Sequence, residues 1–242
     1  METAGQIALN LQKKGLFKDS SILIQKLLES PLDSVETSYL MLIEAGNLRG
    51  LNLNDEANIL IRKAMSIAPP DDLLLQRQLR FQDAAIDAAE GNENLALEKL
   101  SSLHHEKTEI SPHFEAINSN IDFLLGELLT NHKRMAEAVS ILKPLTRSIY
   151  VADDLAKVYY YLGLSHSAIG SSKEAIRFYQ QSLKHNPKPN FKVRAHFGLA
   201  VEFKKLQKRC RAQKEILIAK QKASDLDSSD PVIERITKFT IG

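Results

Sequence analysis

Apolar and small residues between positions 156 and 189 recur every three to four residues in two separate runs, the spacing of one buried helix face. These positions are Tyr159, Leu162 and Gly163 in the first run, and Ala175, Ile176, Tyr179 and Leu183 in the second. The first run stops near Gly170, and the second stops at Asn186-Pro187, because proline cannot continue a helical hydrogen-bond ladder. The pattern therefore predicts two helices joined by a short turn.

Small residues placed twelve positions apart recur along the whole chain. Two helices of a hairpin approach closely only where both carry a small side chain, and Gly163 and Ala175 meet this requirement here. The same spacing recurs in five further pairs, Ala8/Ser20, Ala45/Ala57, Ala84/Ala96, Gly126/Ala138 and Gly198/Cys210. The recurrence predicts six helical hairpins, with glycines expected in the turns at Gly15 and Gly91.

Residues 156–189 resemble a tetratricopeptide repeat, a helix–turn–helix unit of 34 residues. The slots of the family pattern hold Tyr159, Leu162, Gly163, His166, Gly170, Ala175, Tyr179, Ser182 and Pro187, and His166 and Ser182 depart mildly from it. The resemblance extends with more divergence over roughly residues 1–224. It implies an all-α fold, a right-handed superhelical α-solenoid of about six helix pairs.

We expect a single domain over residues 1–242. The expected repeats cover approximately residues 1–34, 38–71, 77–110, 119–152, 156–189 and 191–224. Because the spacing exceeds 34 residues, the first helices of several pairs are expected to start early, and that of the fourth pair to run from about Pro112 to Asn131. Asp230-Pro231 predicts the start of a short helix within residues 230–240 that caps the last pair.

In the resembled family, the first helix of each pair lines a concave groove that binds a partner peptide or helix. The matching positions here are Phe81, Phe123, Glu127, Lys157, Tyr160, Leu164, Lys192, Leu199 and Phe203. The resemblance thus implies a non-catalytic scaffold or adaptor with a protein partner, in a multiprotein complex, and is compatible with a homodimer or stacking on other repeat proteins. The alternative is that Phe123, Tyr160 and Phe203 belong to the core. No three consecutive units reproduce the carboxylate clamp with which some members bind chaperones.

Charge is uneven along the chain, whose net charge is +2. Residues 1–110 hold 17 acidic and 11 basic side chains, whereas residues 111–242 hold 13 and 21. The strongest basic stretch includes Lys204, Lys205, Lys208, Arg209 and Arg211. It raises the alternative of a nucleic-acid-binding α-solenoid. The stretch lacks interleaved aromatic residues that could stack on bases, which favours a solvated helix face.

Signatures of catalysis and metal binding are missing from the sequence. It contains no phosphate-binding or dinucleotide-binding glycine loop, no zinc-protease motif and no serine-hydrolase elbow. Cys210, the single cysteine, is expected to be buried and inert at its small-residue position. His104, His105 and His113 are interpreted as a polar loop, because no cysteine lies beside them. We therefore expect no catalytic residue, no metal and no cofactor.

Membrane and export signals are likewise not visible. The longest run without a charged residue, Val158–Ser172, has 15 residues and is interrupted by polar side chains, so it is too short to span a bilayer. The first residues lack a basic segment followed by an apolar one. The expectation is an intracellular protein of the cytoplasm or nucleus.

Overall fold

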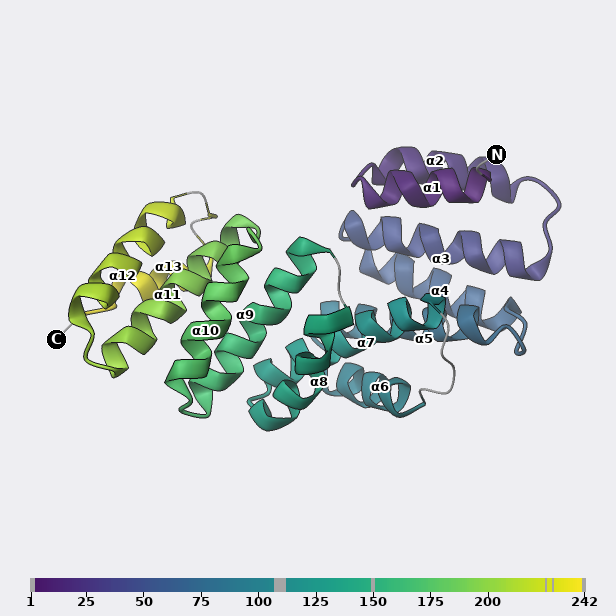
Figure 1. Ribbon diagram of the computed structural model, residues 1–242. Coiled ribbons are helices and arrows are strands. Elements are labelled where there is room, and N and C mark those ends of the chain that lie inside the picture. The colour runs from purple at the N-terminus through teal and green to yellow at the C-terminus, as the bar shows by residue number, and fades with distance from the viewer. Residues whose placement is uncertain (1–2, 107–111, 149–150, 225, 228, 241–242) are drawn as a thin grey trace. The chain divides into compact units, whose positions relative to one another are not determined.

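The computed structural model describes residues 3–106, 112–148, 151–224, 226–227 and 229–240. Within these ranges every regular element is a helix, as the sequence predicts (Figure 1). The chain divides into two compact units, unit 1 over residues 1–121 and unit 2 over residues 122–242. Each unit has its own clusters of buried apolar residues. The single domain expected over residues 1–242 therefore stays a prediction.

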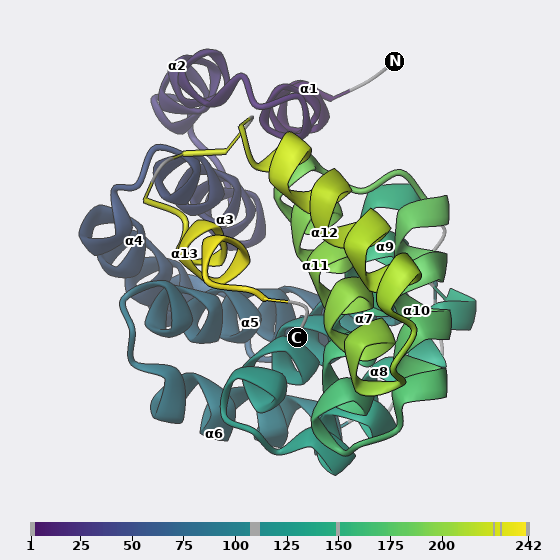
Figure 2. The same cartoon turned by 90° about the vertical axis from the view of Figure 1, so that its left-hand side faces the viewer.

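Unit 1 consists of helix pairs that follow one another. Its helices are α1 (Ala4–Lys13), α2 (Phe17–Leu28), α3 (Ser34–Gly50), α4 (Asn54–Ile67), α5 (Leu73–Ala89), α6 (Glu93–His105) and the first half of α7 (Pro112–Asn131). The pairs α1/α2, α3/α4 and α5/α6 lie in sequence order in Figure 2. The bounds of α7 confirm the early helix start expected at Pro112.

Unit 2 continues with the second half of α7 and shares the same architecture. Its other helices are α8 (Met135–Ser148), α9 (Ala152–Ala168), α10 (Ser172–Lys184), α11 (Pro189–Lys205), α12 (Arg209–Ala223) and the short α13 (Pro231–Thr237). The pairs α9/α10 and α11/α12 pack side by side (Figure 1). The described helices therefore form an α-solenoid of paired helices.

Each hairpin turn has the same backbone design. One residue in each turn adopts the left-handed conformation, with φ between 57° and 84°. These residues are Gly15, Asn52, Gly91, Lys133, Gly170 and Gln207. The next residue donates its backbone N–H to the carbonyl five residues before it, as from Ser171 to His166 at 2.9 Å. This pattern closes the first helix of each pair and reverses the chain. The turn glycines expected at Gly15 and Gly91 are confirmed.

The turn design makes a testable prediction at Gln207, where a side chain occupies a conformation that glycine tolerates best. Gln207→Gly is expected to raise the free energy of unfolding by about 0.5–1 kcal/mol, because the strain at positive φ is removed. Gln213→Gly, at an exposed position inside α12, is the matched control and is expected to cost about 1 kcal/mol. Urea unfolding followed by circular dichroism measures both. A loss of stability in Gln207→Gly would contradict the assigned turn.

Small residues lie at a fixed distance from every turn residue. The helix before the turn has its small residue seven positions earlier, and the helix after it has one five positions later. The residues at these positions are Ala8/Ser20, Ala45/Ala57, Ala84/Ala96, Gly126/Ala138, Gly163/Ala175 and Ala200/Ala212. All twelve are buried. At Gly126 a β-carbon would collide with Leu142 of α8, so the two helices cross in direct contact.

The last hairpin corrects the predicted register by two residues. Ala200 and Ala212 are fully buried at the helix contact, in place of Gly198 and Cys210. Cys210 is exposed, so the expectation of a buried cysteine is wrong. It lies in the first turn of α12, off the buried stripe formed by Ala212, Ile216 and Ala219. The error arose because Gly198 and Cys210 are also small and twelve residues apart.

Helix α13 covers the apolar side of the last pair. Val232 and Ile236 of α13 are buried in one cluster with Val193 and Phe197 of α11 and Ile216 of α12. Asp230 caps the helix by accepting the backbone N–H of Val232 at 2.9 Å. The short helix thus shields side chains that a further repeat would otherwise have to cover.

Candidate functional site

Unit 2 contains a cavity of about 150 Å³ between α9, α11 and α13, which we call the α9–α11–α13 cavity. Its apolar lining includes Leu164, Phe197, Val201 and Val232. Its polar lining consists of Tyr160, Ser167, Tyr179, Arg194 and Arg235. The cavity thus combines apolar side chains with hydroxyl and guanidinium groups, a composition typical of sites that hold a ligand in one orientation.

The corrected register explains which side chains meet at this cavity. The turn residues Gly170 and Gln207 are 37 positions apart, and so are Tyr160 and Phe197, which occupy equivalent places on α9 and α11. By the same offset Leu164 corresponds to Val201, and Lys157 corresponds to Arg194. The residues of α11 that are equivalent to the predicted groove residues of α9 are therefore Arg194, Phe197 and Val201. The sequence had assigned Lys192, Leu199 and Phe203 to the groove instead.

Tyr179 of α10 forms the floor between α9 and α11. A β-carbon on Gly163 would lie 2.7 Å from its Cδ1 atom, and one on Gly198 would lie 2.5 Å from its Cζ atom. Only glycine at both positions leaves room for the ring, and only 2% of Tyr179 is exposed. Burial raises the pKa of the Tyr179 phenol. Gly198 therefore serves the contact between successive pairs, not the contact inside its own hairpin.

Aromatic rings continue from the cavity toward α7. The ring of Tyr160 lies edge-to-face against Tyr161 and Phe191, with both pairs of ring centroids 5.2 Å apart. Tyr161 in turn contacts Phe123 of α7 at 6.1 Å and donates its hydroxyl hydrogen to Glu127. Burial is the main cause that raises the pKa of Tyr161, and the Glu127 carboxylate adds to it. We call the rings of Phe123, Tyr160, Tyr161 and Phe191 the aromatic wall. It contains two of the predicted residues, Phe123 and Tyr160, and the third, Glu127, is hydrogen-bonded to it.

Helix α13 is fastened to the cavity by charged side chains. Nη2 of Arg194 lies 3.1 Å from each carboxylate oxygen of Asp230. The guanidinium carbon of Arg235 lies 5.2 Å from the centroid of the Phe197 ring, in cation–π contact. Burial opposes ionisation of Asp230, but the bonds from the Val232 amide and Arg194 prevail and lower its pKa. The ion pair is therefore present at neutral pH.

The remaining predicted groove residues are placed differently. Lys157 forms ion pairs with Asp153 and Asp154 of its own helix, at 3.1 and 2.9 Å. Lys192 is half-buried on α11, and Phe81 is half-buried on α5 of unit 1. Leu199 and Phe203 are buried in the interior of unit 2, with 2% and 4% exposed, and offer a partner almost no surface.

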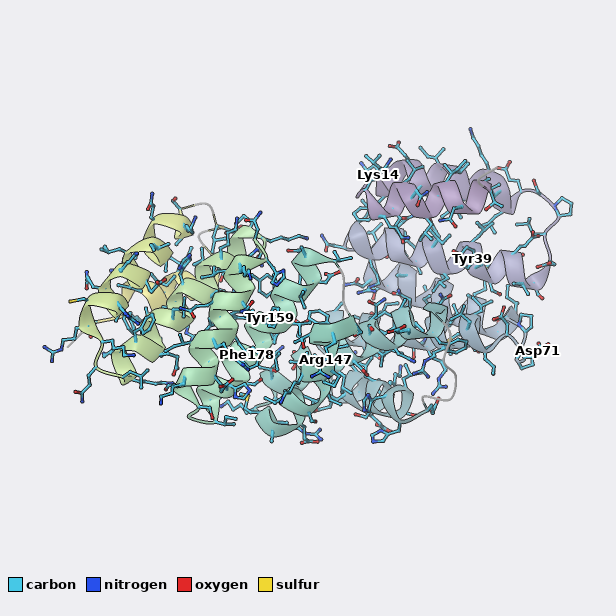
Figure 3. All side chains as sticks on the ribbon, viewed as in Figure 1. Lys14, Tyr39, Asp71, Arg147, Tyr159 and Phe178 are labelled. Carbon is cyan, nitrogen blue, oxygen red and sulfur yellow. The ribbon has the colours of Figure 1, made fainter. Side chains whose placement is uncertain are left out.

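The run of three tyrosines points in different directions. Tyr160 and Tyr161 take part in the aromatic wall, whereas Tyr159 stacks on Phe178 of α10, with ring centroids 6.2 Å apart (Figure 3). The ring of His185 also stacks on the ring of Tyr159, with the two ring centroids 5.5 Å apart. Tyr159 therefore binds its own hairpin together and contributes nothing to the lining of the cavity.

Solved structures with the same arrangement of helices cover between 79% and 97% of the chain. PilF of Pseudomonas aeruginosa superposes with a TM-score of 0.72 at 13% identity, over 97% of this chain and 95% of that one. Residues 41 to the end of MamA from Desulfovibrio magneticus RS-1 give 0.61 at 14% identity, over 79% and 98%. YrrB, a TPR protein with an unusual peptide-binding site, gives 0.59 at 14% identity, over 89% and 98%. These likenesses establish the fold.

The sequence matches a known family over one helix pair. Residues 156–189 match the family model described as Tetratricopeptide repeat. This segment is a tetratricopeptide repeat. It comprises α9 and α10, so the unit from which the resemblance was inferred also supplies Tyr160, Leu164 and Tyr179 to the cavity. No match was found among curated protein sequences.

The basic patch at Lys204, Lys205, Lys208, Arg209 and Arg211 is partly engaged in internal contacts. Lys204 donates to the backbone oxygen of Thr240 at 2.6 Å, and Lys205 pairs with the buried Glu202 at 2.6 Å. The guanidinium of Arg211 lies over the ring of Phe203. Lys208 and Arg209 are exposed. Phe203, the aromatic residue that precedes the patch, is buried and offers no face to a base, so nothing in the patch favours the nucleic-acid alternative.

The histidines differ from their predicted setting. His104 and His105 lie in the last turn of α6, where the sequence suggested a loop, and the side chain of His113 lies outside the described residues. Among the described residues no group of three or more histidine, cysteine or carboxylate side chains could hold a metal ion. None of the described helices is both long and apolar enough to cross a membrane.

Proposed function

We propose that this protein is a non-catalytic scaffold that binds a segment of a partner protein at the α9–α11–α13 cavity, as a subunit of a larger assembly. The observation that carries the proposal is that Tyr160 and Leu164 meet their equivalents in the next repeat, Phe197 and Val201, in one cavity that Arg194 also lines. Aromatic and arginine side chains are the groups that most often anchor a protein partner. The cavity has room for one such anchoring side chain.

Two further observations support the proposal. The fold is shared with YrrB, which has a peptide-binding site. Beside the cavity, Phe123 and Lys192 keep part of their surface exposed, so a bound segment could extend from α11 toward α7. Such an arrangement suits an extended peptide or a helix with apolar anchors and polar edges. Self-association and stacking on other repeat proteins remain part of the same proposal.

A peptide selection tests the proposal. A random peptide library displayed on phage is selected against the full chain, and enriched peptides are synthesised and measured by fluorescence anisotropy. Leu164→Ala is expected to weaken their binding about tenfold, because the side chain lines the cavity. The affinity should change little between low and high salt if apolar anchors dominate.

Leu217→Ala is the matched control, since Leu217 is an exposed leucine on α12 away from the cavity. It is expected to leave peptide affinity unchanged, and thermal melts verify that both variants fold. The proposal fails if Leu217→Ala weakens binding as much as Leu164→Ala. It also fails if no peptide is enriched while a single-stranded RNA binds with a steep dependence on salt.

A further inference from the structure

The charges around the α9–α11–α13 cavity do not balance. Arg194 and Arg235 line it, and no carboxylate is among its lining residues. Asp230, beside the cavity, neutralises one guanidinium through Nη2 of Arg194. Glu202 lies behind Ser167 and accepts hydrogen bonds from Ser167 at 2.5 Å and Lys205 at 2.6 Å. The site therefore holds one positive charge more than its neighbours neutralise.

Arg194 keeps an unused hydrogen-bond donor at this site. Its Nε atom is buried and has no hydrogen-bond partner among the described residues, although Nη2 is paired with Asp230. A buried donor without a partner is costly, and the cost is recovered when a ligand supplies an acceptor. An acceptor oxygen of a ligand that reaches this Nε–H would satisfy it.

Arg235 supplies the second cationic group. It contacts the face of Phe197 but forms no ion pair with a described residue, and its neighbour Glu234 is paired with Lys238. Burial raises the pKa of Tyr160, partly offset by the charges of Arg194 and Arg235, so its hydroxyl stays protonated as a donor. Tyr160, Arg194 and Arg235 all line the cavity, so their polar groups border one enclosed space.

We propose that the α9–α11–α13 cavity binds a carboxylate of the partner segment, held by Arg194, Arg235 and Tyr160, with the adjoining apolar stem against Leu164, Phe197 and Val232. The inference rests on the proposed function and specifies its chemistry. Guanidinium groups bind carboxylates through short, charge-assisted hydrogen bonds, and a partly enclosed site strengthens them. The carboxylate comes from an acidic side chain or from a chain terminus.

The test uses the full chain labelled with nitrogen-15 and observes the Nε–Hε signals of the two arginines, assigned with Arg194→Lys and Arg235→Lys. The probe is 3-phenylpropionate, and 3-phenylpropionamide is the neutral control. Saturable shifts of both signals with the acid, and none with the amide, are expected. Arg235→Met should weaken acid binding about tenfold, whereas Arg211→Met, whose cation lies over Phe203, should not.

Two peptides with the same apolar residues distinguish the sources of the carboxylate. One has a free terminus and no acidic side chain, and the other has an amidated terminus and one glutamate. Binding of either supports the inference and identifies the source. Failure of both, equal shifts with the amide, or shifts with inorganic phosphate alone would overturn it. Selected peptides that depend on Leu164 but contain no carboxylate would also overturn it while leaving the scaffold function intact.

Discussion

Replacing Tyr179 by alanine is expected to lower the free energy of unfolding of unit 2 by about 3–5 kcal/mol, the largest effect of any single substitution considered. The ring lies between Gly163 and Gly198 and is almost fully buried, so its removal leaves a void that two rigid helices cannot close. Hydrogen–deuterium exchange of peptides from α9 to α12, together with urea unfolding, measures the loss in this unit.

A mutant cycle separates packing from other causes. Tyr179→Phe keeps the ring and is expected to retain most of the stability. Gly163→Ala should destabilise the natural chain, because its β-carbon would collide with the ring, but should cost less or even stabilise when Tyr179 is alanine. Additive effects of the two substitutions would contradict the direct contact on which the stacking of these repeats depends.

Arg77→Met is expected to lower the free energy of unfolding of unit 1 by about 1.5–3 kcal/mol. Arg77 is buried, and its guanidinium donates to the carbonyl of Leu103 at 2.6 Å and to the side chain of Asn118 at 2.8 Å. It therefore ties α5 both to the end of α6 and to α7. Methionine fills much of the same volume but leaves both acceptors without this donor.

Arg80→Met on the same helix provides the control. Arg80 pairs with Glu106 at 2.6 Å, but both side chains are about half exposed, with 40% and 43% accessible. An exposed ion pair contributes at most about 1 kcal/mol, so this substitution should cost clearly less than Arg77→Met. If both substitutions lower the free energy of unfolding equally in urea, the burial of Arg77 is not the reason that its hydrogen bonds stabilise unit 1.

The repeated helix hairpin could be predicted from the sequence because its requirements are local. A small residue on each helix, an apolar stripe and a turn glycine lie within about twenty residues of one another, as Gly163, Gly170 and Ala175 do. Two turns have Lys133 or Gln207 at the position where other turns have glycine. These turns still form, because the backbone hydrogen bonds and the packed helices impose the left-handed conformation.

The composition of the cavity could not be predicted in the same way, because it depends on contacts between repeats. Gly198 and Cys210 satisfied the twelve-residue rule as well as Ala200 and Ala212 did, and a shift by two residues turns α11 enough to exchange Leu199 for Val201. Arg235 was missed for a different reason. It lies on α13, which was expected to act only as a cap.

The corrected register changes the meaning of the last repeat. A helix that closes a stack usually presents a polar outer face and no binding residues. Here α13 both buries Val232 and Ile236 against the last pair and contributes Arg235 to the cavity. The same short helix therefore links the stability of the last hairpin to the shape of the proposed binding site.

The central claim is that a partner segment occupies the α9–α11–α13 cavity, and methyl-group NMR tests it most directly. The full chain, labelled at leucine, valine and isoleucine methyl groups, is saturated with a selected peptide. The account predicts intermolecular nuclear Overhauser contacts to Leu164, Val201 and Val232 and none to Leu217. Contacts confined to Leu217 or to other leucines and isoleucines outside the cavity would contradict it.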